Sequence, residues 1–468
     1  MSGKDDMEFF ESVGEMKTDI LIVGTGCSGL YCALQLPDDK QIMMITKSDV
    51  KSSDSYLAQG GICMLKDDAD YDSYFEDTMK AGHYENDPDS VSIMIKSSRN
   101  VITDLLDYGV DFARDGDGTL VFTREGAHSD KRILFHKDIT GAEITGKLLA
   151  AAGKRKNITI LEHTRMVDIV THDNRCYGAV IRKGDGSLDA VEAQYTVWAC
   201  GGIGGLYSHS TNFRHLTGDA LALAIRHNIR LKDINYIQIH PTTLYTDNEE
   251  ERSFLISESV RGEGAKLYDK NMNRFVNELL PRDVVTVEIY KQMEKDQTEF
   301  VWEDLRTIPE DELVTHFPNI VKHCREMGYD VMHECIPVVP AQHYFMGGVW
   351  VDHDSATSME HLYAVGETAC NGVHGRNRLA SNSLLESLVF AKRAAGRMTA
   401  GMDEKFTVEN DMFASLDFSE YEDKEALAGR YHESVRRAIL EADKKMEASK
   451  EEDSHRQAKV AFRKKIVI

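Results

Sequence analysis

The alternation of apolar and polar stretches near the start of the chain predicts a strand, a turn and a helix in close succession. Residues 20–23 (ILIV) are continuously apolar, as in a strand that is buried on both faces of a parallel sheet. A glycine-rich segment follows at 24–29 (GTGCSG), and apolar residues between 30 and 34 then recur at helical intervals. A second apolar run at 41–46 (QIMMIT) fits the next strand. The pattern predicts the first βαβ unit of an α/β fold.

The glycine-rich segment has the spacing GxGxxG of a dinucleotide-binding turn. Gly24 would permit the tight turn, Gly26 would let the backbone approach a pyrophosphate, and Gly29 would allow close packing of helix on strand. The N-terminus of the helix would attract the phosphate charge. Because glycine-rich turns are common, the position between a strand and a helix is what favours this interpretation over a structural turn. The spacing leaves both NAD and FAD open.

Further along the chain, the pattern divides into segments. Short β segments with turns follow residue 157 and end at a second glycine-rich turn, 199–205 (ACGGIGG). Residues 235–346 break the α/β rhythm, and we expect them to be a second domain inserted into the first. Beyond 401 the chain is charged with helical Leu and Ala spacing. The expected divisions are a nucleotide-binding domain at 1–234 and 347–400, an insertion at 235–346, and a helical region at 401–468.

Composition and charge exclude several classes of function. The chain has 468 residues, of which 55 are basic and 78 acidic, for a formal net charge of −23. This excess of negative charge argues against a nucleic-acid or anionic-membrane partner, although solubility alone would account for it. A local basic pocket could still bind a small anion. No apolar run approaches a membrane span, and the N-terminus lacks the pattern of a secretory signal, so we expect a cytoplasmic protein.

The eight cysteines do not form a recognisable metal site. They are scattered along the chain, and none of them forms a CxxC pair. Neither a zinc site nor an iron–sulfur cluster is therefore indicated. We expect reduced thiols and no bound metal.

A set of short motifs occurs in a fixed order and carries a specific resemblance. The motifs are AQGGI (58–62), ACGGIGGLY (199–207), TGDALALA (217–224), IHPT (239–242), RGEGAKL (261–267), PRDVV (281–285), HYFMGGV (343–349) and NRLASNSLLE (377–386). Together they resemble the flavoprotein family of fumarate reductase, succinate dehydrogenase and L-aspartate oxidase, over about residues 18–400. The resemblance implies a Rossmann-like α/β FAD-binding domain, an inserted α+β capping domain, a short C-terminal helical segment and a four-carbon dicarboxylate substrate.

One segment resembles the L-aspartate oxidase branch of that family. It reads REGAHS at 124–129, followed by KRI at 131–133. The resemblance places Glu125 near the substrate amino group, where a charge-assisted hydrogen bond would separate aspartate from succinate. Without this context Glu125 would be an ordinary exposed loop charge. The implied reaction is oxidation of L-aspartate to iminoaspartate, the first step of de novo NAD biosynthesis, with oxygen or fumarate as acceptor and quinolinate synthase as a candidate partner.

The resemblance also implies where FAD binds. Membrane-bound relatives attach FAD through a histidine four residues before the alanine of AQGG, and this chain has Asp54 there, so we expect non-covalent FAD. Thr25 to Ser28 would meet the phosphates, Lys47 the ribose region, and Ser53 to Gly60 the isoalloxazine ring. The matching positions are Gly24, Thr25, Gly26, Cys27, Ser28, Gly29, Lys47, Ser53, Asp54, Ser55, Ala58, Gln59, Gly60, Gly61, Asp219, Glu367, Ser383 and Leu384.

Substrate residues are implied in the same way. His240, His343 and Arg378 would bind carboxylates, Ser257 and Arg261 would lie near the same pocket, and Arg282 matches the family's proton-transferring arginine. Arginine suits carboxylate binding because its planar guanidinium can donate two parallel hydrogen bonds to the two carboxylate oxygens. The family usually has threonine where this chain has Ser257, and serine keeps the hydroxyl. Taken singly, each of these residues would more often be structural; their convergence from distant motifs is what favours a site.

Two other functions stay open. The first is a soluble fumarate reductase or another C4-dicarboxylate oxidoreductase of the same fold, and the second is a flavoprotein that serves only as a subunit or scaffold. A charged pocket argues against the scaffold, which has no use for one. The part of the chain after Gly401 is shorter than the C-terminal helical domain that is usual in the L-aspartate oxidase branch.

Overall fold

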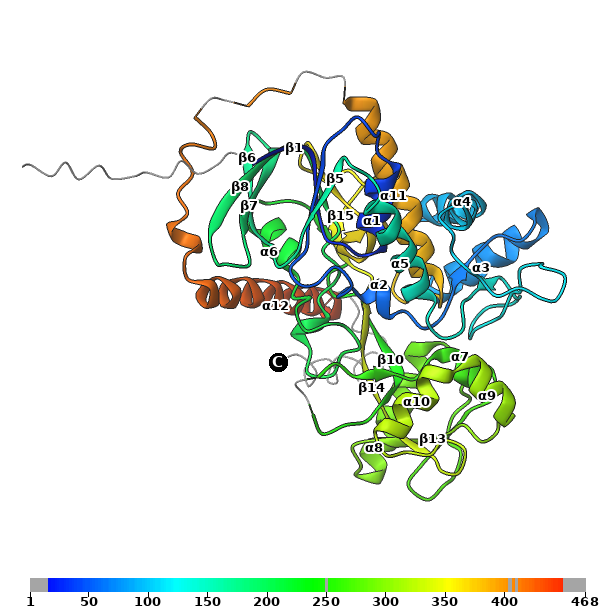
Figure 1. Cartoon of the computed structure of the whole chain (residues 1–468). Helices are drawn as coiled ribbons and strands as arrows, with labels where there is room; N and C mark the ends of the chain where they lie inside the picture. The colour runs from blue at the N-terminus through cyan, green and yellow to red at the C-terminus, as the bar shows by residue number, and fades with distance from the viewer. Residues whose placement is uncertain (1–15, 249–250, 403–405, 409–410, 449–468) are drawn as a thin grey trace, which may run out of the picture.

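The central element of the structure is a mostly parallel sheet. The computed structural model describes residues 16–248, 251–402, 406–408 and 411–448 (Figure 1). Its main sheet has the order β5-β2-β1-β8-β7-β6, with β16 also paired to β8. The parallel strands are β1 (Met16–Val23), β2 (Ile42–Ile45), β5 (Ile158–Leu161), β8 (Leu188–Trp198) and β16 (Leu362–Ala364). The apolar runs expected to be strands β1 and β2 therefore lie side by side.

The two faces of this sheet are covered differently. Ile20 and Ile22 of β1 pack toward α1 (Cys27–Gln35), α4 (Pro88–Asp107), α5 (Thr140–Ala152) and α11 (Asn382–Gly401). Leu21 and Val23 alternate to the opposite face, where α6 (Asp219–Arg226) and α12 (Lys424–Ala448) lie against the antiparallel strands β6 (Arg165–His172) and β7 (Arg175–Arg182). Figure 1 shows these two layers on opposite sides of β1.

A few short elements lie between the main sheet and the rest of the chain. They include α2 (Asp54–Leu57), α3 (Tyr71–Ala81) and the paired strands β3 (Ile62–Cys63) and β4 (Ile133–Leu134). A three-stranded sheet has the order β17 (Ala369–Cys370), β15 (Gly348–Trp350) and β9 (Leu231–Lys232). Short 3-10 turns occur at 68–70, 204–206, 366–368 and 419–421.

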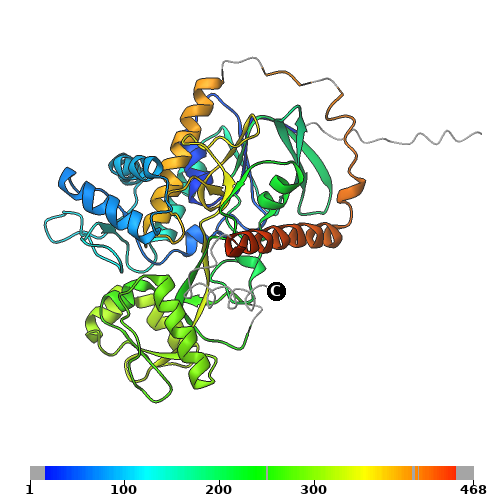
Figure 2. The ribbon, with the colours of Figure 1, turned by 180° about the vertical axis from the view of Figure 1, so that it is seen from behind.

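A second lobe has its own sheet and core. Its strands are ordered β11 (Phe254–Leu255), β10 (Ile237–Leu244), β14 (Ile336–Phe345), β13 (Val301–Asp304) and β12 (Lys266–Tyr268). The helices α7 (Glu258–Gly262), α8 (Arg282–Asp296), α9 (Glu310–His316) and α10 (Pro318–Glu326) complete it, and its apolar residues form a separate cluster. Figures 1 and 2 show this lobe below the main sheet. We propose that it is the inserted domain at 235–346, and we call it the cap; the rest is the main body.

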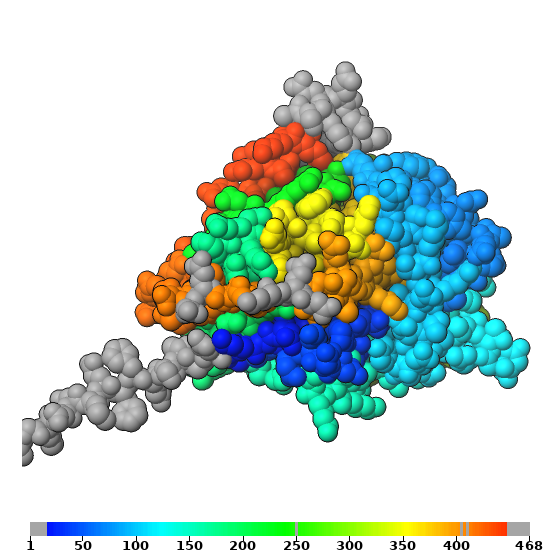
Figure 3. All heavy atoms as spheres, turned by 90° about the horizontal axis from the view of Figure 1, so that it is seen from above, coloured from blue at the N-terminus to red at the C-terminus, as the bar shows by residue number. Residues whose placement is uncertain are grey.

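The C-terminal part is attached to the main body by buried polar contacts. The Tyr421 hydroxyl donates to Asp168 Oδ2 at 2.7 Å, and the Tyr431 hydroxyl donates to the Val167 carbonyl at 2.6 Å. Leu427, Val435 and other apolar residues of this part join the core beneath β6 to β8. Figure 3 shows this orange to red segment on the flank away from the light-blue α3 and α4 region. In the described part of the chain, no helix has both the length and the apolarity to cross a membrane.

One carboxylate of the main body caps a helix of the cap. Asp138, in the loop before α5, is almost fully buried. Its Oδ2 accepts hydrogen bonds from the backbone N–H groups of Asn319 and Ile320, at 2.9 and 3.2 Å, and its Oδ1 accepts from the Asn319 amide at 2.6 Å. These N–H groups lie at the start of α10, where helix donors lack intrahelical partners. Asp138 therefore joins the two lobes.

Replacing Asp138 with alanine should loosen α10 without unfolding the main body. Loss of a helix cap costs about 1 kcal/mol, so amide hydrogen exchange at the start of α10 should accelerate about fivefold. Asp311→Ala is the matched control, because Asp311 is an exposed carboxylate in the first turn of the neighbouring α9. Equal exchange rates at α10 in the two variants would contradict the role of Asp138 as a joint.

Candidate functional site

A long cavity runs from the N-terminus of α1 to the underside of the cap. Every FAD and substrate position expected from the sequence lines it, except Gly29 and Arg261. The walls come from the end of β1 and the start of α1, the end of β2, α2, the segment after β8, and the strands β10 and β14 of the cap. The cavity therefore lies across the junction of the two lobes.

The glycine-rich turn at one end of the cavity leaves no room for larger residues. Gly24 has φ of 122°, and a Cβ there would lie 2.0 Å from the carbonyl oxygen of Ala199 on the neighbouring strand. A Cβ on Gly29 would lie 2.2 Å from the carbonyl oxygen of Gly24. Gly29 thus allows the helix to pack on the strand, which explains why it is absent from the cavity wall. Gly24 and Gly29 shape the turn, and Gly26 lines the cavity.

The start of α1 is suited to a phosphate group. Gly26 is the N-cap, and it offers no side chain to the helix; the first turn carries no acidic residue. The positive end of the helix dipole therefore faces the cavity without a protein anion nearby on the helix. The neighbouring Cys27 N–H donates to the Ser55 hydroxyl at 2.9 Å, which joins α1 to the segment expected to line the flavin ring.

Lys47 lies at the end of β2 and is bound to other residues of the protein. Its Nζ donates to the His215 carbonyl at 2.7 Å and the Thr217 hydroxyl at 2.9 Å, and it pairs with Asp219 at 2.9 Å. Arg165, which sequence reasoning missed, binds the other oxygen of Asp219 at 3.0 Å. Burial would raise the pKa of Asp219, but the charges of Lys47 and Arg165 outweigh it and hold the pKa below its ordinary value. A charged cluster thus closes this side of the cavity.

Polar atoms along the middle of the cavity have unmet hydrogen-bonding capacity. Asp54 Oδ1 accepts from the Phe213 N–H at 3.0 Å, while Asp54 Oδ2 and Gln59 Oε1 are buried with no partner among the described residues. Burial raises the pKa of Asp54 to about 7 and that of Glu367 to about 8. Buried polar atoms are normally paired, so a polar ligand is expected here. Together with the bare N-terminus of α1, these atoms fit FAD.

The far end of the cavity brings four substrate-binding candidates together. His240 on β10 and His343 on β14 come from antiparallel neighbouring strands, and their ring centroids are 5.1 Å apart. Arg282 is the first residue of α8 in the cap, and Arg378 precedes α11 in the main body. His240, Arg282 and Arg378 are buried, His343 is of intermediate exposure, and all four line the cavity.

Gln238 on β10, which sequence reasoning missed, fixes the two arginines relative to each other. Its Oε1 accepts from Arg282 Nη1 at 2.9 Å, and its Nε2 donates to the Arg378 carbonyl at 2.8 Å. Arg378 Nη1 donates to the Ser383 hydroxyl at 2.8 Å, and the guanidinium lies 4.5 Å from the centroid of the Tyr344 ring. The guanidinium groups are thus held at defined positions before a ligand binds.

The electrostatics of this end favour an anion. Burial, followed by the charge of Arg282, lowers the pKa of His240 and His343 well below the ordinary histidine value and that of Arg378 to about 10. His240 Nε2 and Arg378 Nε are buried without a hydrogen-bond partner in the described ranges. The histidines are therefore neutral and the arginines charged, and a dicarboxylate would both neutralise the charge and satisfy these atoms.

The tautomers of the two histidines can present donors to that ligand. The Thr242 N–H donates to His240 Nδ1 at 3.2 Å in one tautomer, which leaves Nε2–H facing the cavity. The other tautomer would donate from Nδ1 to the Thr242 carbonyl at 3.0 Å. His343 Nδ1 lies 2.8 Å from the Thr211 hydroxyl, which can donate to it and again leave Nε2–H free. A carboxylate selects the tautomers that carry hydrogen on Nε2.

Glu258 is the principal site residue that sequence reasoning missed. It begins the short helix α7, directly after Ser257, and its Oε2 accepts a hydrogen bond from Arg282 Nε. Burial would raise its pKa, but Arg282 and Arg261 together hold it below the ordinary value. Arg261 Nη2 lies 3.9 Å from Glu258 Oε2, and Arg261 Nη1 donates to the Glu278 carbonyl at 2.7 Å. Arg261 thus lies behind Glu258 rather than on the cavity wall. The i,i+3 spacing of Glu258 and Arg261 was the signal in the sequence that could have identified Glu258 as a partner of the expected arginine.

Glu125 lies between the two lobes, at the same end of the cavity. Its Oε1 accepts from the Ser259 hydroxyl of the cap at 2.8 Å, and its Oε2 accepts from the Ser381 hydroxyl of the main body at 2.6 Å. It is buried and lines the cavity. Ser257 caps α7 by accepting from the Ser259 N–H at 3.3 Å. The pocket therefore combines an anion-binding surface with two carboxylates, Glu258 against Arg282 and Glu125 at its edge.

Comparison with known proteins gives the following similarities. A family model described as an FAD binding domain matches residues 19–384. L-aspartate oxidase of Clostridium perfringens is 51% identical over 385 residues, which cover 82% of this chain and 87% of that protein. L-aspartate oxidase of Clostridium acetobutylicum is 49% identical over 380 residues, covering 81% and 87%. A solved quinol-fumarate reductase with menaquinol molecules superposes with a TM-score of 0.82 at 29% identity, covering 88% of this chain and 76% of that one.

The two neutral histidines of the cavity should make the protein sensitive to acid. Below about pH 6.5 the unfolded chain protonates His240 and His343 while the folded protein does not, so the unfolded state binds more protons and stability falls as pH falls. Each histidine contributes up to about 1.4 kcal/mol per pH unit to this slope. Chemical denaturation between pH 7 and 5 should therefore give a shallower slope for the double variant H240N/H343N than for the natural chain.

The control for this measurement is an exposed histidine. His333 has a side chain that is 81% exposed, so His333→Asn should leave the pH slope of the unfolding free energy unchanged. A double variant with the same slope as the natural chain would show that His240 and His343 are not held neutral.

Proposed function

The chain belongs to the L-aspartate oxidase family of FAD-binding flavoproteins, and from this premise we propose that it oxidises L-aspartate to iminoaspartate. The expected family, fold class and FAD cofactor are confirmed by the similarities above. The observation that supports the substrate is the buried pair of arginines with Glu125 at the edge of their pocket. Two positive groups match the two carboxylates of aspartate, and the separate carboxylate matches its amino group.

The two carboxylates would be bound by groups that are already in place. Arg378 and the neutral rings of His240 and His343 can donate to one carboxylate, and Arg282 can donate to the other. Gln238 holds the Arg282 side chain and the Arg378 backbone, and Ser383 holds the Arg378 guanidinium, so little side-chain freedom is lost on binding. The main work of the protein is then to hold Cα at a fixed position, which accelerates a reaction between two bound groups.

Glu125 would supply the discrimination between amino and non-amino substrates. A carboxylate that accepts from an ammonium group forms a charge-assisted hydrogen bond, whereas succinate would leave that carboxylate facing two hydrogens on carbon. The hydroxyls of Ser259 and Ser381 hold the two oxygens of Glu125 from opposite lobes. The amino group would therefore be bound by a carboxylate whose orientation is fixed.

When bound, FAD would accept the hydride that leaves Cα, while the substrate nitrogen gives up a proton and the C=N bond forms. The residues of this chain bind the substrate, orient it and exclude water, because the pocket lies where the cap closes on the main body. Reoxidation by fumarate would give succinate. In that direction Arg282 would donate a proton to carbon and regain one from solvent on product release, and the Glu258 carboxylate in contact with its Nε would stabilise the restored cation.

Several finer points belong to the same proposal. The FAD would be non-covalent, because Asp54 occupies the position of the flavin-linking histidine. The cofactor positions expected from the sequence would hold it, with Arg165 and Ser381 added to them. The acceptor would be oxygen or fumarate, the reaction would open de novo NAD biosynthesis in the cytoplasm, and quinolinate synthase would be the partner that takes up the product.

The proposal is tested by reducing the enzyme-bound flavin anaerobically with L-aspartate. We expect bleaching of the flavin absorbance, with iminoaspartate formed, and recovery of the absorbance when oxygen or fumarate is added in parallel samples. Succinate in place of L-aspartate is the matched comparison, since it lacks only the amino group. Bleaching by succinate but not by L-aspartate would replace the proposal with a C4-dicarboxylate oxidoreductase, and a yellow protein inert with all C4 acids would support a scaffold.

Replacing Glu125 with glutamine should separate the two substrates. The variant keeps the shape but loses the charge that pairs with the ammonium group, so kcat/KM for L-aspartate should fall about 100-fold, far more than for fumarate reduction. Asp130→Asn is the matched control, because Asp130 is a carboxylate on the same loop that pairs with Lys66 at the surface. Equal losses for aspartate and fumarate would refute the role of Glu125 in binding the amine.

A further inference from the structure

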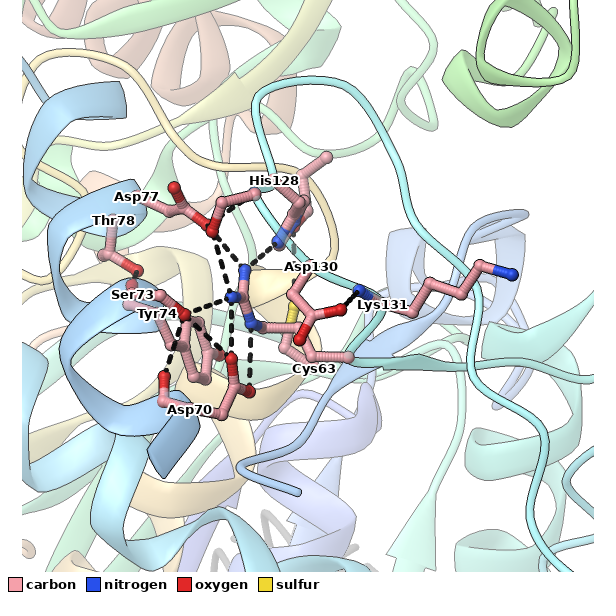
Figure 4. A network of polar contacts seen from close by, with 12 residues as sticks. Cys63, Asp70, Ser73, Tyr74, Asp77, Thr78, His128, Asp130 and Lys131 are labelled. Atoms are coloured by element: carbon pink, nitrogen blue, oxygen red, sulfur yellow. Dashed lines mark hydrogen bonds and ion pairs between the residues drawn. The ribbon is translucent and has the colours of Figure 1, made fainter. Parts of the chain in front are cut away.

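A buried network of charged and polar groups lies beneath the loop that carries Glu125. At its centre is Arg132, whose side chain is fully buried. Its Nε and Nη2 donate to Asp70, at 3.2 and 2.9 Å, and its Nη1 donates to Asp77 at 2.6 Å and to His128 Nδ1 at 3.0 Å. Figure 4 shows Asp70, Asp77 and His128 converging on this side chain. Neither Arg132 nor His128 lines the cavity.

The network joins helix α3 to that loop. Asp77 lies on α3, and Asp70 directly precedes that helix. Ser73 accepts from Arg132 Nη2 at 2.9 Å, and the guanidinium lies 5.0 Å from the centroid of the Tyr74 ring. Burying the charges of Arg132, Asp70 and Asp77 is costly unless each is paired. Buried ion pairs of this kind can favour one arrangement of the chain over others. Here the arrangement that they select is that of residues 125–132.

His128 continues the network toward Glu125 by two routes. Its backbone N–H donates to the Glu125 carbonyl at 3.3 Å, which closes a tight turn in which Ala127 has φ of 64°. Its ring Nε2 lies 3.0 Å from the Ala380 carbonyl. Because Nδ1 accepts from Arg132, the hydrogen of the neutral ring is on Nε2, and the ring donates to Ala380. Burial lowers the pKa of His128, which keeps this tautomer neutral.

The residue after Ala380 is the one that holds the Glu125 carboxylate. Ser381 has a left-handed φ of 60°, which a non-glycine residue adopts only where its surroundings hold it. Its carbonyl accepts from the Cys63 N–H at 3.1 Å, and its hydroxyl accepts from the Gly61 N–H at 3.1 Å. The same hydroxyl donates to Glu125 Oε2. The contact from His128 to Ala380 therefore helps to fix the direction in which Ser381 presents its hydroxyl.

We propose that His128, held by Arg132, is a positioning residue that sets the preference for an amino dicarboxylate over one without an amino group. It touches neither substrate nor cofactor, and it acts by fixing the carboxylate of Glu125 from both its backbone and its side-chain contacts. The inference rests on the proposed function, in which Glu125 receives the amino group. It assigns the selectivity of the site to residues outside the cavity wall.

The informative variants are His128→Leu and His128→Gln. Leucine has a similar bulk but neither accepts from Arg132 nor donates to Ala380. Glutamine has an amide that can do both, so it should restore most of the function. Ser73→Ala is the matched control: it removes a contact between Arg132 and α3 and leaves the groups that His128 contacts in place.

The first readout is binding rather than turnover. Calorimetry on the anaerobically reduced holoenzyme measures the affinities for L-aspartate and succinate, since neither reacts with reduced flavin. A hydrogen bond to a charged group is worth about 10- to 100-fold in affinity, so H128L, which misplaces the Glu125 carboxylate, should bind L-aspartate more weakly by about that factor. Its affinity for succinate should change less than about threefold, because no interaction with an amino group is lost. H128Q and S73A should keep the ratio of the natural chain.

The second readout is a double-mutant cycle with Glu125→Gln. If His128 acts through Glu125, H128L should cost little L-aspartate affinity in the E125Q background, so the two effects should be far from additive. Additive losses, or equal losses for L-aspartate and succinate, would overturn the proposal and leave His128 a residue of general stability. If H128L gives no folded yellow protein, Ser381→Ala removes the last link and should show the same selective loss.

Failure of this inference is distinct from failure of the proposed function. If L-aspartate does not reduce the flavin of the natural chain, the proposed function is wrong. If L-aspartate reduces it and H128L keeps the natural ratio of affinities, the function stands and the positioning role of His128 is wrong.

Discussion

The structure depends on positive charge that is buried where its two lobes meet. Arg282 of the cap and Arg378 of the main body lie in one cavity with two histidines, and burial together with Arg282 holds those histidines neutral. Arg282 pairs with Glu258, whereas Arg378 forms no ion pair among the described residues and is only near enough to Glu367 and Glu125 for their charges to oppose, in part, the lowering of its pKa by burial. Charge buried without full compensation is costly, and a dicarboxylate ligand removes that cost. A dicarboxylate bound between the lobes would therefore compensate buried charge that comes from both of them.

Two buried carboxylates at this site have different tasks because they have different neighbours. Glu258 contacts Arg282, lies near Arg261, and has a pKa held below the ordinary value, so it balances the charge of the cap. Glu125 accepts hydrogen bonds only from serine hydroxyls among the contacts that the structure shows. No arginine contacts it in the described part of the chain, although Arg378 is near enough for their charges to interact, so its oxygens stay available to an ammonium group. The separation of these two environments is what allows one pocket to bind both signs of charge.

Much of this arrangement could be predicted from the sequence, and the reasons are local. The apolar run of β1, the turn at Gly24 and the helix α1 follow from residues that are adjacent in the chain. The site residues were found because the family resemblance marks their positions, within motifs such as IHPT or outside them, as for Lys47 and Ser257. Gln238, beside the IHPT motif, and Ser381, within NRLASNSLLE, were missed because their contacts join segments far apart in sequence. Glu258 was missed although its i,i+3 spacing to Arg261 was a signal, and Arg261, expected near the pocket, lies behind Glu258 because a motif does not show how deeply a residue is buried. Which of two charged neighbours faces a cavity depends on packing across both lobes.

The fold separates recognition of the dicarboxylate from recognition of the amine. The side chains expected to bind the dicarboxylate lie on strands β10 and β14 and at the ends of two helices, which form the framework of the site. The amine would be bound by Glu125, which lies on a loop, and loops can vary in sequence without disturbing the core. Such a loop is mobile unless something holds it, and selectivity for one amino group requires a defined carboxylate. The buried network centred on Arg132 holds this loop and so meets that requirement. A change of substrate class therefore needs changes in the loop and in the network that holds it, rather than in the framework of strands and helices.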